Sequence, residues 1–125
     1  MSAGEVILVE DDPGMREALE KVLSAAGFTP RSFPSGEALL DAQGGVTAGC
    51  LVLDVRLPGI SGLDLYRRLA QRGQTLPAVF ITAYDDPSVR EEAEGLGAAA
   101  FLHKPFRGRA LVEVVSEIIG VGAAS

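Results

Sequence analysis

The 125-residue chain contains one cysteine, Cys50, and one histidine. No apolar stretch approaches the roughly 20 residues that a membrane-spanning helix requires. A single cysteine excludes both a disulfide framework and a cluster of thiolate metal ligands, and apolar neighbours indicate that Cys50 is a small core residue. The first residues, MSAGEVILVEDD, have no basic segment before their short apolar run, so we interpret the run as a strand and not as a signal peptide. We therefore expect a cytoplasmic protein with no membrane partner.

Positive charge is also scarce, because 17 acidic side chains outnumber 11 lysines and arginines and the net charge is −6. This balance opposes attraction to phosphate backbones, so we expect no direct nucleic-acid binding by this chain. The sequence has no GxxxxGK[ST] motif, which excludes a P-loop nucleotidase. With 47% apolar and 22% charged residues, the composition is typical of a globular protein. The length predicts one domain over residues 1–121, followed by a frayed tail at 122–125.

Hydrophobic patterning predicts strands and helices in strict alternation. Apolar runs predict strands at 5–9, 28–33, 50–55, 76–83 and 98–104. Helical spacing predicts helices at 15–26, 35–43, 61–72, 85–97 and 109–120. Asp12 and Asp86 each precede a proline and are typical of helix N-caps, and Pro30 places the second strand near a sheet edge.

Five strand–helix units joined by short loops predict a parallel sheet, because parallel neighbours need crossover connections. Right-handed crossovers place helices on both faces of such a sheet, and strands 50–55 and 76–83 are apolar on both faces, as central strands are. We therefore expect a doubly wound α/β domain. Domains of this class bind ligands at the carboxyl ends of their strands.

Charged and polar residues stand at these strand ends. The first strand is followed by Glu10 and Asp11, the third ends in Asp54, the fourth in Thr82, and the fifth is followed by Lys104. If the three carboxylates converge, their mutual repulsion requires a cation among them. Oxygen ligands without cysteine or histidine favour Mg²⁺. Lys104 could supply a point charge to a phosphoryl group and Thr82 a hydrogen bond.

Four segments at matching spacing, LVEDDPGMRE, LVLDVRLPGISGLDL, VFITAY and FLHKPF, carry a resemblance to a known family. The chain resembles the receiver domain of bacterial two-component response regulators over nearly all of its length. The resemblance implies a flavodoxin-like three-layer sandwich with five helices and a five-stranded parallel sheet of order 2-1-3-4-5.

The resemblance also implies a metal site and a phosphorylation site. Asp54 would be the phosphoacceptor, a nucleophile that attacks the phosphorus of a phosphohistidine. Asp11, Asp54 and the backbone carbonyl of Arg56 would coordinate Mg²⁺, and Glu10 would act through a bound water. Glutamate at position 10 stands where aspartate is the commoner residue of the family.

Further roles follow from the same resemblance. Thr82 and Lys104 would contact the phosphoryl group, and the Lys104–Pro105 peptide bond would be cis. Phe101 would be the aromatic switch residue, in place of the commoner tyrosine, and would change the surface of the fourth helix, fifth strand and fifth helix. Arg56 and Tyr84 lie at positions that tune dephosphorylation.

The function implied is phosphorelay signalling by a module that is not an enzyme, although it assists its own phosphorylation and dephosphorylation. Its partners would be a sensor histidine kinase and an output domain or partner protein. Whether the chain works alone or is the front half of a transcription factor stays open, as does a phosphorylation-dependent homodimer.

Two other functions would place ligands or substrates at the same residues. A flavodoxin-like FMN carrier would share the sheet order, but carboxylates at Glu10 and Asp11 would repel the cofactor's phosphate. A phosphatase with an aspartyl nucleophile would need a second acid two residues after Asp54, where Arg56 stands. Structural roles are the alternative for single residues: Asp54 as a loop cap, Lys104 and His103 as surface residues, and Phe101 as plain core.

Overall fold

The computed structural model describes residues 4–42, 48–83 and 86–120. Within these ranges the strands are β1 (Glu5–Val9), β2 (Thr29–Phe33), β3 (Cys50–Asp54), β4 (Ala78–Thr82) and β5 (Ala100–His103). The helices that alternate with them are α1 (Pro13–Ala25), α2 (Gly36–Leu40), α3 (Gly62–Gln71), α4 (Pro87–Gly95) and α5 (Gly108–Ile119). No helix in the described ranges is both long enough and apolar enough to cross a membrane.

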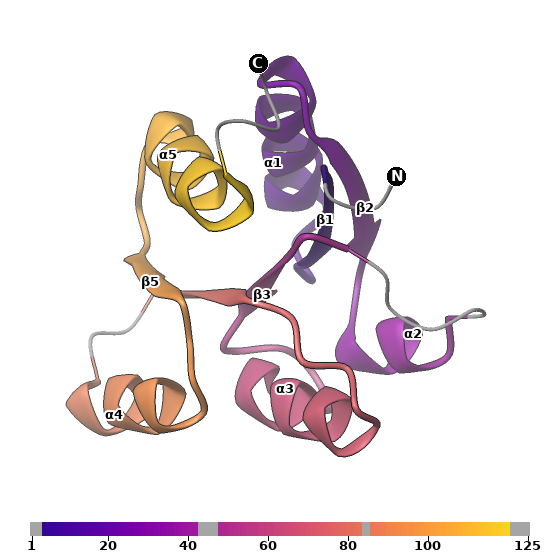
Figure 1. Ribbon diagram of the computed structural model, residues 1–125, viewed down its shortest axis with the longest axis vertical. Helices are drawn as coiled ribbons and strands as arrows, with labels where there is room; N and C mark the ends of the chain where they lie inside the picture. The colour runs from indigo at the N-terminus through magenta and orange to yellow at the C-terminus, as the bar shows by residue number, and fades with distance from the viewer. Residues whose placement is uncertain (1–3, 43–47, 84–85, 121–125) are drawn as a thin grey trace.

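The five strands form one parallel sheet in the order β2-β1-β3-β4-β5. Figure 1 shows α1 and α5 on one face of the sheet and α2, α3 and α4 on the other. This is the doubly wound three-layer sandwich expected from the alternation of elements, and the predicted strand order is confirmed. Every residue of β3 and β4 is buried, because helices cover both faces of these central strands.

The sheet separates two apolar cores. On one face, Leu19 and Leu23 of α1 and Leu111 and Val115 of α5 pack against the sheet. On the other face, the buried side chains of α2, α3 and α4 pack around Phe80 of β4. The two cores hold the strands rigidly, so the residues just beyond the strand ends keep fixed positions relative to one another.

Several predicted boundaries differ from the structure. The helix predicted at 35–43 starts at Gly36, because Ser35 is its N-cap and accepts a hydrogen bond from the Ala38 amide at 3.1 Å, and it ends at Leu40, with Asp41 as the C-cap. Residue 43 lies outside the described residues. In α3, the large buried side chains are Leu63, Leu65, Tyr66 and Leu69, whereas Ala70 is exposed.

The two predicted N-caps are confirmed, although the helices start at Pro13 and Pro87 and not at the predicted positions 15 and 85. The Asp12 carboxylate accepts a hydrogen bond from the Gly14 amide at 3.0 Å, and the Asp86 carboxylate accepts one from the Ser88 amide at 3.0 Å. Both helices begin with proline at the next residue. The predicted tail at 122–125 and Tyr84 lie outside the described residues.

Candidate functional site

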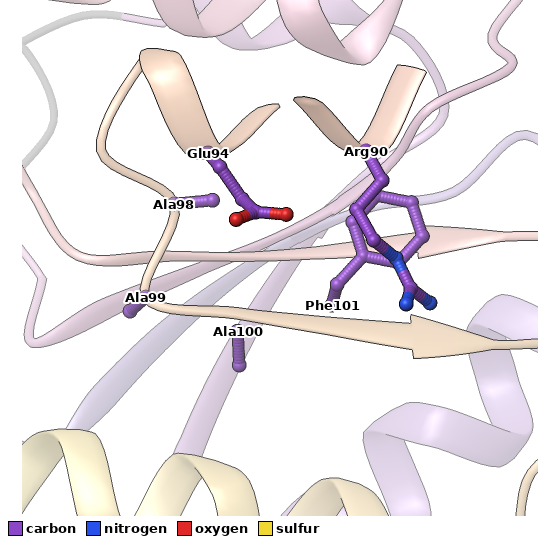
Figure 2. A pocket seen from close by; sticks show the side chains of 6 residues that line it. All are labelled: Arg90, Glu94, Ala98, Ala99, Ala100 and Phe101. Carbon is purple, nitrogen blue, oxygen red and sulfur yellow. The ribbon is translucent and has the colours of Figure 1, made fainter. Parts of the chain in front are cut away.

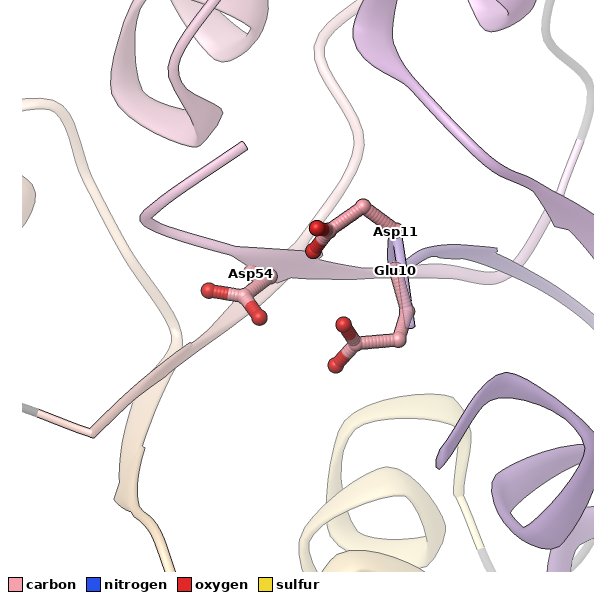
Figure 3. A group of neighbouring side chains, drawn as sticks. All are labelled: Glu10, Asp11 and Asp54. Carbon is pink, nitrogen blue, oxygen red and sulfur yellow. The ribbon is translucent and has the colours of Figure 1, made fainter. Parts of the chain in front are cut away.

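The first part of the site is formed by the carboxyl ends of β1 and β3. These strands are parallel neighbours, and Val9 is paired with Leu53, so the residues that follow them emerge side by side. Figure 3 shows the carboxylates of Glu10, Asp11 and Asp54 directed into a common space. Their nearest oxygens all lie within 4.8 Å of one another. The fold therefore brings the three carboxylates together, which is the condition on which the expected cation site depends.

Burial distinguishes the three acids. Glu10 is 1% exposed and Asp54 is 5% exposed, whereas Asp11 is exposed. A buried carboxylate needs hydrogen-bond or ionic partners, because its desolvation is unfavourable. The partners of Glu10 and Asp54 therefore decide the electrostatics of the site.

Lys104 is the partner that the two buried acids share. Its ammonium donates to Asp54 Oδ2 at 2.8 Å and to Glu10 Oε1 at 3.0 Å. The residue follows β5, on the far side of β4 from Asp54, and the peptide bond between Lys104 and Pro105 is cis. The side chain thus reaches across the edge of the sheet into the acidic cluster.

Two pKa values in the cluster are shifted. Burial raises the pKa of the Glu10 carboxyl above its usual value, although hydrogen bonds from the Asp12 amide and from Lys104 oppose the rise. Burial by itself would lower the pKa of the Lys104 ammonium, but its hydrogen bonds to Asp54 and Glu10 outweigh this effect and the pKa is raised. Lys104 is therefore held in its charged form at neutral pH.

The backbone around Asp54 is tightly held. The Arg56 amide donates to Asp54 Oδ1 at 2.9 Å, so the carboxylate is oriented from one side by the loop and from the other by Lys104.

The main-chain carbonyl of Asp54 lies against Gly62, the first residue of α3. An added Cβ on Gly62 would come within 2.2 Å of the carbonyl oxygen. The glycine lets α3 begin close to the strand end.

The main chain of Glu10 has a partner that the sequence analysis missed. Arg16, in the first turns of α1, donates from Nη1 to the Glu10 carbonyl at 2.9 Å. The sequence signal for this contact is the spacing of Arg16, four residues after the N-cap Asp12. This spacing places Arg16 one helical turn from the cap, close to the end of β1. Through this hydrogen bond, Arg16 holds the end of the strand.

Thr82 is the last residue of β4 and is 2% exposed. Its carbonyl accepts a hydrogen bond from the Lys104 amide at 2.7 Å, which ties the end of β4 to the segment after β5. The residue lies at the same edge of the sheet as Asp54, since Asp54 is paired with the preceding residue, Ile81.

Phe101 lies further down the sheet, paired with Phe80, and not at the acidic cluster. Its ring is partly buried, and the Arg90 guanidinium lies over it at 5.1 Å from the ring centroid. Both residues line a hollow of about 310 Å³ between α4 and β5, shown in Figure 2. A movement of this ring would therefore change the surface formed by α4 and β5.

The donor set of the cluster fits a hard divalent cation. Three carboxylates and one ammonium leave two excess negative charges when all are ionised, and Glu10, Asp11 and Asp54 offer oxygen atoms only. Oxygen ligands in this number suit Mg²⁺, which keeps several of its coordination positions for water or phosphate oxygens. The same charge disfavours a flavin phosphate at this edge of the sheet.

The fold and the site together define a doubly wound α/β domain with an acidic cluster and a lysine at the carboxyl edge of its sheet. The family model of the response regulator receiver domain matches residues 6–116. The chain belongs to this family, the receiver domains of two-component response regulators, and is a signalling module.

Similar proteins agree with this assignment. The chain is 37% identical over 120 residues to the transcriptional regulatory protein TdiR of Thauera aromatica, covering 96% of this chain and 53% of the relative. It is 36% identical over 116 residues to the transcriptional regulatory protein FixJ of Bradyrhizobium diazoefficiens, covering 93% of this chain and 57% of the relative. The chain thus spans about half the length of these curated relatives.

Solved structures show the same fold. The structure of FixJ-N superimposes with a TM-score of 0.82 at 31% identity and covers 92% of each chain. The response regulator StyR gives a TM-score of 0.85 at 37% identity, covering 96% of this chain and 61% of that one.

Proposed function

We propose that this chain accepts a phosphoryl group on Asp54, in a Mg²⁺-dependent reaction, from a phosphohistidine of a sensor histidine kinase. The observation that carries the proposal is the placement of Asp54: a buried carboxylate, bound by Lys104, within a cluster of three acids at the edge of the sheet. A carboxylate that served only as a loop cap would not need a second and third acid beside it.

The chemistry assigned to Asp54 is a displacement at phosphorus. A carboxylate oxygen forms a bond to phosphorus while the bond between phosphorus and the histidine nitrogen breaks. The imidazole leaves with the electron pair and takes up a proton from solvent. This reaction depends on positioning and charge neutralisation more than on covalent help from the protein. Asp54 is held for it by hydrogen bonds from the Arg56 amide and from Lys104.

Asp11, Asp54 and the Arg56 carbonyl would hold Mg²⁺, with Glu10 acting through a water molecule. When bound, the ion neutralises the charge of the carboxylates and of the phosphoryl oxygens. Lys104 carries the remaining positive charge and would move its hydrogen bond from Asp54 to the transferred phosphoryl group. Thr82 would donate its hydroxyl hydrogen to another phosphoryl oxygen.

Phosphorylation would then alter the surface of α4, β5 and α5. It adds about two negative charges and three acceptor oxygens at Asp54. Thr82 would be drawn toward these oxygens, and Phe101 would turn inward toward the space that Thr82 leaves. The ring would thereby leave the Arg90 guanidinium, which now lies over it. Arg56, two residues after Asp54, would influence the lifetime of the phosphate.

The partners proposed are the kinase and an output domain or partner protein. The matched relatives are named transcriptional regulatory proteins and are about twice as long as the matched region. We assign residues 1–121 to the receiver domain of such a regulator, acting in the cytoplasm, without direct nucleic-acid contact by this chain. A homodimer formed on phosphorylation is the remaining partner proposed.

Intact-mass measurement after incubation with acetyl phosphate and Mg²⁺ tests the central claim. Wild type is expected to gain the mass of one phosphoryl group, and Asp54→Asn is expected to gain none. Asp86→Asn, an exposed acid that caps α4, is the matched control and should be modified like wild type. Modification of Asp54→Asn to the wild-type extent, or no modification of wild type, would contradict the proposal.

A further inference from the structure

Glu37 of α2 contacts the loop between β3 and α3, although 23 residues separate the two in sequence. Its Oε2 atom accepts a hydrogen bond from the Ile60 amide at 3.0 Å. Both carboxylate oxygens also lie against Gly59, where an added Cβ would be 2.2 Å from Oε2 and 3.1 Å from Oε1. The carboxylate is therefore seated on the backbone of residues 59–60.

A second contact joins the same two segments. Gly36 packs beside Ile60, since a Cβ at Gly36 would lie 3.5 Å from the Ile60 Cβ, and the Ile60 side chain is partly buried against the core. Further along, Arg72 at the end of α3 donates to the Leu40 carbonyl at 3.1 Å. The first turn of α2 and the β3–α3 loop thus form one packed unit.

This loop begins at the phosphoacceptor. The Arg56 amide binds Asp54 Oδ1, Leu57 is buried in the core, and Gly62 lies against the Asp54 carbonyl. Between Leu57 and Gly62, the residues Pro58 and Gly59 are exposed, and Gly59 has a φ of +76°. The hydrogen bond from Ile60 to Glu37 restrains this exposed part of the loop.

We propose that Glu37 is a positioning residue for phosphoryl acceptance: it fixes the β3–α3 loop and, through the loop, the Arg56 carbonyl and the Asp54 carboxylate. The inference rests on the proposed function, in which both groups bind Mg²⁺. A side-chain oxygen that accepts a hydrogen bond from the Ile60 amide and packs on Gly59 restrains a short loop at two consecutive residues. Groups of this kind, which orient a metal ligand without touching the metal, commonly change metal affinity tenfold or more when removed.

The test compares Glu37→Ala with Glu37→Gln by calorimetric Mg²⁺ titration of the unphosphorylated chain. Glu37→Ala should weaken Mg²⁺ binding about tenfold. Glu37→Gln should stay within about twofold of wild type, because its side-chain oxygen can still accept from the Ile60 amide. Glu113→Ala, which removes an exposed acid from α5, controls for the change in net charge and should bind as wild type does.

Amide hydrogen exchange at Ile60 provides a readout that does not need the metal. Exchange should accelerate in Glu37→Ala and remain slow in wild type and Glu37→Gln. Wild-type Mg²⁺ affinity in Glu37→Ala, or equal losses in the Ala and Gln variants, would overturn the inference. A wild-type chain that binds no Mg²⁺ would contradict the proposed function, and unchanged Ile60 exchange in Glu37→Ala would separately refute the role of Glu37.

Discussion

Cys50 lies in β3 and is fully buried, and its burial raises the pKa of the thiol to about 12 from an ordinary value of 9.0. At a pH between 9.0 and about 12, the thiol of the unfolded chain has lost its proton, whereas the thiol of the native chain keeps it. The native state then binds more protons, so the free energy of unfolding must fall as the pH rises above 9.0. The thiol should accordingly be inert in the folded protein at neutral pH.

Urea unfolding measures this effect. From about pH 8 to about pH 10, wild type should lose about 1.4 kcal/mol more stability than Cys50→Ala. The variant is less stable throughout because it loses packing, but it lacks this ionisation, and the other titrating groups contribute equally to both proteins. Parallel stability curves for the two proteins would show that the thiol is not shielded as its burial indicates.

The acids of the site were accessible to sequence reasoning because each one follows directly from a strand end. The strand order implied by the family resemblance makes β1 and β3 parallel neighbours, which was enough to bring Glu10, Asp11 and Asp54 together. Glu37 and Arg90 could not be found in this way. Each acts from a helix on a partner distant in sequence, and that contact depends on how the helix packs.

At the scale of elements, the same distinction separates the strands from α2. The predicted bounds of β1 equal the observed ones, and those of β3 and β4 differ from the observed bounds by at most two residues. These strands were predictable because their apolar side chains face helices on both sides of the sheet. The short α2 has no comparable periodicity. Its extent is set by the Ser35 cap and by contacts of Gly36 with α3 and the preceding loop.

The start of α3 offers a prediction about element placement. A Cβ on Gly62 would lie 2.2 Å from the Asp54 carbonyl oxygen, which belongs to the rigid backbone of β3. Gly62→Ala must therefore displace α3 or the strand end, and should lower the free energy of unfolding by about 1–3 kcal/mol. It should also weaken Mg²⁺ binding, since Asp54 moves with the strand.

Gly95→Ala is the matched control for this substitution. Gly95 ends α4, has no atom within 4 Å of an added Cβ, and does not have a positive φ. Alanine there should raise the free energy of unfolding by about 0.5 kcal/mol, because it restricts the unfolded chain. Both variants are compared by urea unfolding, and equal stabilities would refute the close approach of α3 to β3.

Across the whole molecule, the sheet connects the acidic cluster to a distant surface. The Lys104 amide binds the Thr82 carbonyl at 2.7 Å, and β4 and β5 remain paired from there down to Phe101. Arg90 of α4 covers the Phe101 ring. Under the proposed function, a shift of Thr82 would pass through these packed neighbours toward α4, whereas α1 lies on the other face of the sheet, in the second core.

This route predicts where a phosphate analogue will act. Beryllofluoride with Mg²⁺ should shift the amide resonances of residues 86–106, and the Arg90 Nε–H resonance, more than those of the C-terminal half of α1. The larger shifts are expected because the proposed inward turn of Phe101 would remove its ring from under Arg90 and change the ring current felt by α4. Two-dimensional NMR of wild type and Asp54→Asn provides the measurement, with no shifts expected in the variant.

The Phe101→Leu variant tests the part played by the ring. It should keep the shifts around Asp54 but lose those of Arg90, because leucine has no ring to move. Shifts spread evenly over the domain, or an Arg90 response unchanged in Phe101→Leu, would mean that the signal does not pass through this ring.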